Sequence, residues 1–368
     1  MKNKAALDIY YIKKTFELAK KGNYTTHPNP RVGALVVKNN TIIGKGYHKN
    51  PGSSHAEQIA IKNAGSNCKG STLYVNLEPC CHFGKTPPCL DLIIRSKIKR
   101  VVISSIDPNP LVNGKSITQL KHAGIEVKIG ICNDDAIEIN KGFYSKFLNK
   151  KPFVVVKSGI SLDGKIALHN GKSKWITSSL SRSDVQKERA LTSMILTTSE
   201  TVLADNPRLT VRDVGLKKKI FKQPDLALLD SNLRISPKSK IFSDSSRKIY
   251  LFTSKKSKEK LTVSFKPNVQ IISLPYKNQK LDMIKCFEIL ANQGVNDILV
   301  ESGSTLISSL FKHSLVDELL LYISPKILGN TSTNFSGIDY IQKLSKKIKL
   351  KISDMIPIGN NLKVRLSK

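Results

Sequence analysis

Short apolar runs alternate with longer amphipathic stretches along all 368 residues, and this alternation is interrupted once. The interruption lies at residues 147–152, where Lys150 and Lys151 precede Pro152 and a new apolar run begins at Phe153. Strands that alternate with helices build layered α/β domains, and a chain of this length can form two separate cores. The sequence therefore predicts two α/β domains, residues 1–148 and residues 149–368.

The periodicity of apolar residues predicts individual elements in each half. In the first half we expect helices at 7–21, 55–64 and 87–97, and strands at 32–38, 41–47, 71–76, 100–105 and 125–129. In the second half we expect strands at 153–157, 193–198, 225–230, 248–253, 297–301 and 316–323, and helices at 181–191, 279–293 and 304–313. Residues 254–268 and 330–347 are expected to be loops or weak elements.

The chain is strongly basic, with a net charge of +32 from 60 basic and 28 acidic residues. A basic surface can bind nucleic acid or a phosphorylated small molecule. The lysines are dispersed over both halves and form no aromatic-interleaved patch, so we expect solvated surfaces and no nucleic-acid partner. The chain has no apolar run near the roughly 20 residues of a membrane span and no apolar signal core. We therefore expect a cytoplasmic protein without a membrane partner.

A set of metal-binding residue types is concentrated in the first half. His55-Ala56-Glu57 is followed by Pro79-Cys80 and then by Cys89. A hydrolytic zinc site needs three protein ligands and one open position for water, and His55, Cys80 and Cys89 can supply one nitrogen and two sulfurs. Glu57 can carry the proton from the attacking water to the departing amine. This pattern is typical of zinc-dependent deaminases.

The cysteine spacing leaves rival ligands. Eight residues separate Cys80 from Cys89, where the usual deaminase motif has two, and Cys81 and His82 lie in this interval. Pro88 precedes Cys89 at an expected helix start, where the helix dipole favours a thiolate. We therefore favour Cys80 and Cys89 over Cys81 and His82.

Two further patterns suggest ligand-binding turns. His27 and Asn29 lie on a loop stiffened by Pro28 and Pro30, and we expect both side chains to face the deaminase cavity. The second half has no Gly-x-Gly-x-x-Gly segment, which argues against a conventional dinucleotide fold. Instead, the strand expected at 297–301 leads through residues 302–305 into a helix, and such a turn can bind a phosphate.

At these motifs the chain resembles the bifunctional riboflavin biosynthesis deaminase/reductase family. The resemblance covers essentially the whole chain and is carried by residues 25–30, 78–89, 107–110, 140–143, 161–165, 175–177 and 201–205, and by Glu301 and Gly303. The wide cysteine spacing is normal in that family. The family usually has serine where Cys81 stands and often arginine where Lys85 stands, so a bidentate contact at Lys85 is in doubt.

The resemblance implies a cytidine-deaminase-like α/β/α domain followed by a dihydrofolate-reductase-like α/β domain, with Zn²⁺ and NADPH as cofactors. The residues that it implies for NADPH are Gly159, Ile166, Trp175, Thr201, Asp205, Ser231, Gly303, Ser304, Thr305, Leu306, Ile307, Ser308 and Ser309. The residues that it implies for the reductase substrate are Ser173, Arg189, Leu209, Arg212 and Glu301. Guanidinium groups such as those of Arg189 and Arg212 suit a ribose phosphate.

The resemblance also implies the reactions. They are deamination of 2,5-diamino-6-(5-phosphoribosylamino)pyrimidin-4-one and then reduction of its ribosyl group to a ribityl chain, by a homo-oligomer. A proton donor for the reduction is not evident, although Lys157 ends a strand that enters the expected pocket. Two alternatives are a nucleic-acid base deaminase with an accessory domain and a non-catalytic zinc-stabilised interaction module.

Overall fold

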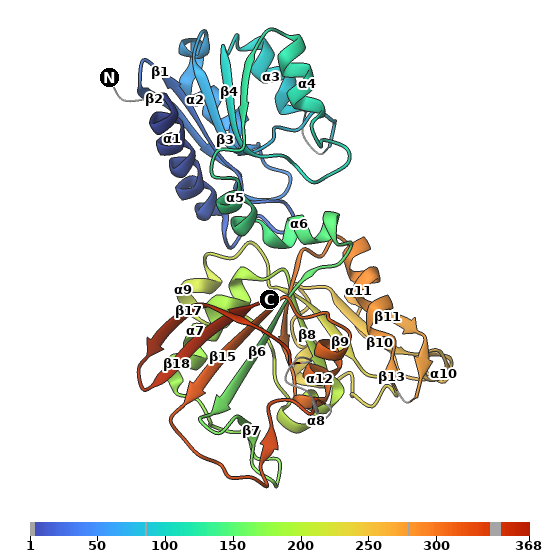
Figure 1. Cartoon of the computed structure of the whole chain (residues 1–368). Coiled ribbons are helices and arrows are strands. Elements are labelled where there is room, and N and C mark those ends of the chain that lie inside the picture. Colours follow the sequence, from blue (N-terminus) through green and yellow to red (C-terminus); the bar gives the residue numbers. More distant parts are fainter. Residues whose placement is uncertain (1–3, 85–86, 279, 339–346) are drawn as a thin grey trace. The chain divides into compact units, whose positions relative to one another are not determined.

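The computed structural model describes residues 4–84, 87–278, 280–338 and 347–368, and it divides into two compact units, Met1–Lys150 and Lys151–Lys368. Each unit is built around one large sheet (Figure 1). Within the described ranges, no helix has the length and apolar character needed to cross a membrane.

The first unit is a three-layer α/β/α sandwich. Its sheet has the strand order β2-β1-β3-β4-β5, and the strands are Thr41–Tyr47, Gly33–Lys38, Thr72–Leu77, Arg100–Ser105 and Glu126–Ile129. The pairs of β1 with β2 and β3 are antiparallel, whereas β3, β4 and β5 run parallel. The helices are α1 (Lys4–Ala19), α2 (Ala56–Ala64), α3 (Cys89–Arg95), α4 (Lys115–His122), α5 (Asn133–Ile139) and α6 (Lys141–Leu148).

Alternation along the strands produces the two faces of this sheet. Val36 packs in one core with residues of α2, α3 and α4, whereas its neighbours Leu35 and Val37 pack in the opposite core with residues of α1 and α5. Successive strand side chains point to opposite faces, so a strand buried on both sides must be apolar throughout. This explains why β1 shows no polar alternation.

The second unit contains a nine-stranded sheet. The strand order is β11-β10-β9-β8-β14-β6-β15-β18-β17, with bounds Val269–Leu274, Ile249–Ser254, Asp225–Leu229, Met194–Thr198, Asp297–Glu301, Phe153–Ser161, Glu318–Ser324, Asn361–Ser367 and Lys351–Ile358. The strands from β11 to β15 pair in parallel, and β18 and β17 add an antiparallel edge. Two short ladders join β12 (Tyr276–Lys277) with β13 (Lys280–Leu281) and β7 (Lys165–Ala167) with β16 (Thr333–Asn334).

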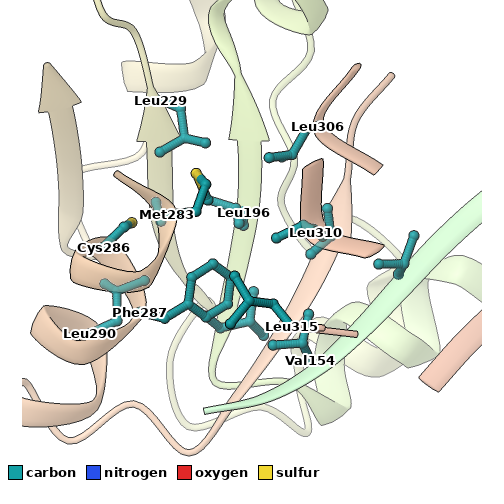
Figure 2. Packing of buried hydrophobic residues seen from close by; sticks show 14 of the residues in the cluster. Val154, Leu196, Leu229, Met283, Cys286, Phe287, Leu290, Leu306, Leu310 and Leu315 are labelled. Carbon is teal, nitrogen blue, oxygen red and sulfur yellow. The ribbon is translucent and has the colours of Figure 1, made fainter. Parts of the chain in front are cut away.

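Helices cover both faces of this sheet. The helices are α7 (Ser179–Leu191), α8 (Ser199–Asp205), α9 (Val214–Lys217), α10 (Lys255–Glu259), α11 (Met283–Asn292) and α12 (Ser304–Lys312). Figure 2 shows Phe287 and Leu290 of α11 and Leu310 of α12 packed over Leu196 of β8. Val185 of α7 packs on Leu320 and Tyr322 of β15 in another cluster.

Several expected bounds were wrong. The first helix begins at Lys4, and its last turn, Lys20–Gly22, is a 3-10 helix. The expected loop 254–268 contains the short helix α10, whose N-cap is Ser254. The expected loop 330–347 contains β16, and its residues 339–346 lie outside the described part of the chain. Gln279, the expected first residue of a helix, is also outside it, and that helix begins at Met283, where Asp282 caps the backbone N–H of Lys285.

Candidate active sites

In the first unit, three elements deliver metal-binding atoms to one point. His55 caps the start of α2, Cys80 follows β3, and Cys89 is the first residue of α3. The Nδ1 atom of His55 lies 3.4 Å from Sγ of Cys80 and 3.3 Å from Sγ of Cys89. Among the described residues these three form the one metal-compatible group, with ligand atoms within 4.8 Å of one another.

This arrangement fits zinc. Ordinary Zn–N and Zn–S lengths with tetrahedral angles place a nitrogen and a sulfur about 3.6 Å apart. The observed separations are close to that value, and three ligands leave a fourth position for water. The structure therefore brings together the three residues that the sequence analysis selected.

The two rival ligands lie outside this group. The Sγ atom of Cys81 lies 3.6 Å from the backbone carbonyl of Leu111. The Nδ1 atom of His82 is buried and has no hydrogen-bond partner among the described residues. Lys85 lies outside the described residues, so the structure does not show its surroundings.

Glu57 lies in the first turn of α2 with 3% of its surface exposed. Burial raises the pKa of this carboxyl group to about 7, against the opposing effect of His55. A carboxyl group with a pKa near neutrality can both accept and release a proton, as general acid–base catalysis requires.

Glu57, His55 and Cys80 line a cavity of about 280 Å³, whereas Cys89 is buried and is not part of its lining. Asn29 lines this cavity too, and its Nδ2 atom lies 3.0 Å from Nε2 of His48. His27 does not line it, contrary to expectation, and its Nε2 atom lies 3.3 Å from Nη2 of Arg31. This contact accounts for the direction of the His27 ring.

Sequence reasoning missed three residues of the cavity wall, namely His48, Asp107 and Asn109. Burial raises the pKa of Asp107 to about 7. The motif at 107–110 was part of the family resemblance, but nothing in it assigned a role to Asp107 or Asn109. His48 carried no sequence signal.

Glu78 holds the segment that carries these two residues. Its carboxylate accepts hydrogen bonds from the backbone N–H groups of Asp107 (3.2 Å) and Gly114 (3.0 Å) and from the hydroxyl of Ser116 (2.7 Å). Because Glu78 lies two residues before Cys80, the chain that leaves β3 positions both Cys80 and the segment that carries Asp107 and Asn109.

In the second unit, two of the expected substrate residues, Arg189 and Glu301, are in direct contact. This carboxylate ends β14 and accepts hydrogen bonds from Nε and Nη2 of Arg189, at 2.6 and 3.0 Å. Nζ of Lys157 lies 3.3 Å from it. Burial raises the pKa of Glu301, but the cations Arg189 and Lys157 more than offset this effect and hold the pKa at about 2. The carboxylate is therefore ionised.

Leu209 and Arg212 lie on the segment between α8 and α9, close to Arg189. Nη1 of Arg189 donates a hydrogen bond to the carbonyl of Thr210, at 3.2 Å. Arg212 has its pKa lowered by burial and by the neighbouring cation Arg189. Ser173 lies in the loop before Trp175.

Most residues expected to bind NADPH follow the carboxyl ends of parallel strands, where ligands bind in open α/β sheets. Thr201 lies in the first turn of α8 after β8, Ser231 follows β9, and Gly303 follows β14 as the N-cap of α12. The hydroxyls of Thr198 and Ser302 lie 3.2 Å apart and connect the ends of β8 and β14.

The glycines differ in their surroundings. A Cβ added at Gly303 would meet no atom within 4 Å, so the chain itself leaves space there. A Cβ at Gly159 would lie 3.0 Å from the methyl group of Thr177. The space beside Gly303 suits close approach of a ligand to the backbone.

Helix α12 can present mainly backbone groups and polar side chains to a cofactor. The side chains of Leu306 and Ile307 are buried in the core. The hydroxyl of Ser308 donates to the carbonyl of Ser304 and accepts from the N–H of Gly337. A second cavity of about 860 Å³ is lined by four residues of the expected cofactor turn, Ser304, Thr305, Ser308 and Ser309.

The remaining expected cofactor residues are Trp175, Asp205 and Ile166. Trp175 is 63% exposed, and the guanidinium of Arg182 lies 4.1 Å from its ring centroid. Asp205 ends α8 and is 3.8 Å from Nζ of Lys174. Ile166 lies in β7.

A buried glutamate at a cavity, beside one histidine and two cysteines that can hold a metal, defines the zinc-dependent deaminase class. The chain joins this site to a second α/β unit with a polar site at its strand ends. Comparison with known proteins identifies both parts. Residues 6–105 match the cytidine and deoxycytidylate deaminase zinc-binding region, and residues 152–364 match the RibD C-terminal domain.

Full-length relatives agree. The chain is 42% identical to the riboflavin biosynthesis protein RibD of Buchnera aphidicola, over 98% of each chain, and 38% identical to that of Escherichia coli, over 98% of this chain and 99% of the relative. Two solved structures are similar over 99% of each chain at 34% identity. One is RibD of Acinetobacter baumannii, with a TM-score of 0.90. The other, with a TM-score of 0.86, is a diaminohydroxyphosphoribosylaminopyrimidine deaminase/5-amino-6-(5-phosphoribosylamino)uracil reductase of Thermotoga maritima.

The chain belongs to the RibD family of bifunctional riboflavin biosynthesis enzymes. It is a zinc-dependent deaminase of a small pyrimidine joined to an NADPH-dependent reductase. The expected family, fold class, activities and cofactors are thereby confirmed.

Proposed function

We propose that the first unit deaminates 2,5-diamino-6-(5-phosphoribosylamino)pyrimidin-4-one and that the second unit reduces the ribosyl group of the product to a ribityl chain. The observation that carries the deaminase proposal is that His55, Cys80 and Cys89 bring their ligand atoms together beside a cavity that His55, Cys80 and buried Glu57 line. We assign the deaminase to residues 1–148 and the reductase to residues 149–368.

In the deaminase step, His55, Cys80 and Cys89 hold zinc, which supplies a polarised water molecule as the nucleophile. Glu57 accepts a proton from the attacking water and delivers it to the amine nitrogen as ammonia departs. Its pKa of about 7 suits both transfers. Asn29, Asp107 and Asn109 line the same cavity and present amide and carboxyl groups to the edge of the pyrimidine.

In the reductase step, NADPH supplies the hydride and the chain orients the two reactants. The turn at residues 303–305 holds a cofactor phosphate. Residues 306–309, with Gly159, Ile166, Trp175, Thr201, Asp205 and Ser231, complete the NADPH site. Arg189, Arg212 and the backbone of Leu209 hold the ribose phosphate, with Ser173 at the rim. Glu301 keeps Arg189 in place through two hydrogen bonds and is itself ionised.

One incubation tests both halves. The purified protein with zinc and the aminopyrimidine phosphate should release ammonia without NADPH, and addition of NADPH should lead to oxidation of one cofactor per ammonia released. An RNA stem-loop should release no ammonia, which separates this proposal from a nucleic-acid base deaminase. Ammonia release from the RNA alone would contradict it.

The assembly and the compartment belong to the same proposal. We propose a homo-oligomer acting in the cytoplasm on a small molecule, with no nucleic-acid or membrane partner. Support comes from the family resemblance and from the dispersed distribution of lysine. A mass measurement in solution that gives a monomer at micromolar concentration would contradict the assembly.

A further inference from the structure

The segment at residues 206–213 lacks regular secondary structure, although it contains two of the proposed phosphate-binding residues, Leu209 and Arg212. Its backbone groups are paired with buried side chains from elsewhere in the unit. Gln223 accepts a hydrogen bond from the N–H of Val211 (2.8 Å) and donates one to its carbonyl (3.0 Å). The N–H of Arg212 donates to the side chain of Gln186 at 2.8 Å. The conformation of this segment is therefore imposed by its surroundings.

Arg247, which lies just before β10, also supports this segment. Its side chain is 1% exposed and donates hydrogen bonds to three backbone carbonyls, those of Leu209 (2.7 Å), Arg208 (2.8 Å) and Ile241 (3.0 Å). No carboxylate is hydrogen-bonded to it in the described part of the chain. Burial lowers the pKa of Arg247 to about 10, so the group still carries its charge at neutral pH.

Two of these carbonyls belong to consecutive residues, and the second residue is strained. Leu209 has a φ of 48°, in the left-handed region that a residue with a Cβ rarely adopts. Such a conformation persists only where the surrounding structure requires it, and it is common at ligand-binding positions. The guanidinium of Arg247 donates hydrogen bonds to the carbonyls of the two peptides that flank the Leu209 Cα, and thereby stabilises this conformation.

The charge of Arg247 is unusual for a purely structural support. A buried guanidinium is costly, and within the described residues Arg247 makes no ion pair, so that Asp244 and Asp225 act on it only at longer range. Besides burial, Arg189 lowers the pKa of Arg247, while Asp244 and Asp225 raise it. Arg189 and Arg208 lower the pKa of Arg212, and Glu301 raises it. Among the described residues, no ion pair joins Arg208 or Arg212 to a carboxylate. The segment and its support therefore concentrate positive charge where an anion would relieve it.

We infer that Arg247 is a positioning residue for the reductase, which sets the backbone at Leu209 so that this segment can receive the phosphate group of the substrate. The inference rests on the proposed function, which places that phosphate at Arg189, Leu209 and Arg212. Arg247 does not touch the substrate in this account. It acts through the carbonyls of Arg208 and Leu209.

The test compares Arg247→Met and Arg247→Lys with the unaltered full-length enzyme, using the deaminated reductase substrate with and without its phosphate. Arg247→Met should raise the KM for the phosphorylated substrate roughly tenfold or more, because small displacements of a binding group have large effects. The KM for the dephosphorylated substrate, the KM for NADPH and the kcat at saturation should change less than about twofold. Arg247→Lys keeps the charge but loses the guanidinium geometry. It should raise the KM for the phosphorylated substrate by a smaller factor and should again leave the KM for the dephosphorylated substrate nearly unchanged.

The chain offers two controls for folding. Deamination takes place in the other unit and should be unchanged in both variants. Asp317→Asn weakens contacts to Lys151 and to the N–H of Val154 at the start of β6. It should lower the stability of the reductase unit without changing the KM for the phosphorylated substrate. If Arg247→Met does not fold, the selectivity of Arg247→Lys decides the question.

Arg212→Ala separates the failure of this inference from the failure of the proposed function. If Arg212→Ala leaves the KM for the phosphorylated substrate unchanged, the proposed phosphate site is wrong. If Arg212→Ala raises that KM and the Arg247 variants do not, or if these variants raise the KM of both substrate forms equally, Arg247 has no positioning role. A rise in KM for the phosphorylated substrate alone, both in Arg212→Ala and in the Arg247 variants, supports the inference.

Discussion

At the scale of single residues, one position separates His55, a proposed metal ligand, from Glu57, the proposed proton carrier. His55 caps α2 and Glu57 lies in its first turn, so the helix start fixes the directions of both side chains. The residues that bury Glu57, and thereby raise its pKa, are distant from it in the sequence. The His-x-Glu motif therefore predicts His55 and Glu57, but it does not predict which residues line the cavity around them.

The exchange Glu57→Gln tests the proton-transfer role. The amide keeps the size of the side chain but cannot carry a proton, so deamination should fall about 10²–10⁴-fold. Zinc content should remain one per chain, and reduction of the deaminated substrate should be unaffected. Both rates and the zinc content can be measured on one preparation. A deamination rate within a factor of two of the unaltered enzyme would refute the role.

The cysteine exchanges test the ligand assignment. Cys81→Ser should leave zinc content and deamination nearly unchanged, because Sγ of Cys81 lies against the carbonyl of Leu111. Cys80→Ser and Cys89→Ser should each lose zinc and deamination and retain the reductase activity. Metal analysis of the three proteins checks this. Zinc lost from Cys81→Ser but kept in Cys89→Ser would reverse the assignment.

At the scale of elements, the sequence was informative where a strand is buried on both faces or where a helix has a clear start signal. The runs at β1, β4 and β14 were placed within a residue or two, because continuous apolar stretches bounded by polar residues allow little else. Helix α10 was missed because its sequence is almost entirely charged, and such a short helix has no apolar period to detect.

The same contrast holds for the sites. His55, Cys80 and Cys89 were found because metal-binding residue types at close spacing form a pattern. His48, Asp107 and Arg247 were not assigned roles, because their importance comes from tertiary placement that one sequence does not display. Gln186 and Gln223 support the segment at 206–213 and are ordinary polar residues in the sequence.

The turn from β14 into α12 provides a prediction at this scale. Gly303→Val should raise the KM for NADPH, because the space beside Gly303 would be filled by a branched side chain where a cofactor phosphate is proposed to approach. Deamination should be unchanged. The strand and the helix should still form, since the φ of Gly303 is −81° and no protein atom lies near an added Cβ. Calorimetry that shows unchanged NADPH binding would mean that the turn serves only as a helix cap.

At the scale of the whole molecule, each unit contains a buried cluster of opposite charges within a chain that is otherwise strongly basic. In the first unit, Arg100 donates hydrogen bonds to Asp8 at 2.7 and 2.8 Å and to Glu126 at 2.8 Å. In the second unit, Glu301 accepts hydrogen bonds from Arg189 and Lys157. The chain has 28 acidic residues and 60 basic residues, so few other carboxylates are present to pair with these cations. The folded chain therefore depends on the ionisation of these carboxylates.

This dependence predicts how the stability of the reductase unit varies with pH. The pKa of Glu301 is held at about 2 in the folded chain, below its ordinary value of 4.5, so folding favours the ionised form. The resulting stabilisation is fully present above pH 4.5 and is lost as the pH falls toward 2. It amounts to on the order of 3 kcal/mol. Trp175 is the only tryptophan and lies in this unit, so its fluorescence can follow urea unfolding at each pH.

The variant Glu301→Gln isolates this contribution. At pH 7 it should unfold at lower urea concentration than the unaltered protein, because Arg189 and Lys157 lose the carboxylate that pairs with them. Between pH 4.5 and pH 2 its free energy of unfolding should fall less steeply, since one group with a shifted pKa is gone. Glu288→Gln, which breaks the exposed pair with Lys285, is the matched control and should keep the original slope. Equal slopes for Glu301→Gln and the unaltered protein would show that the acid sensitivity arises elsewhere in the chain.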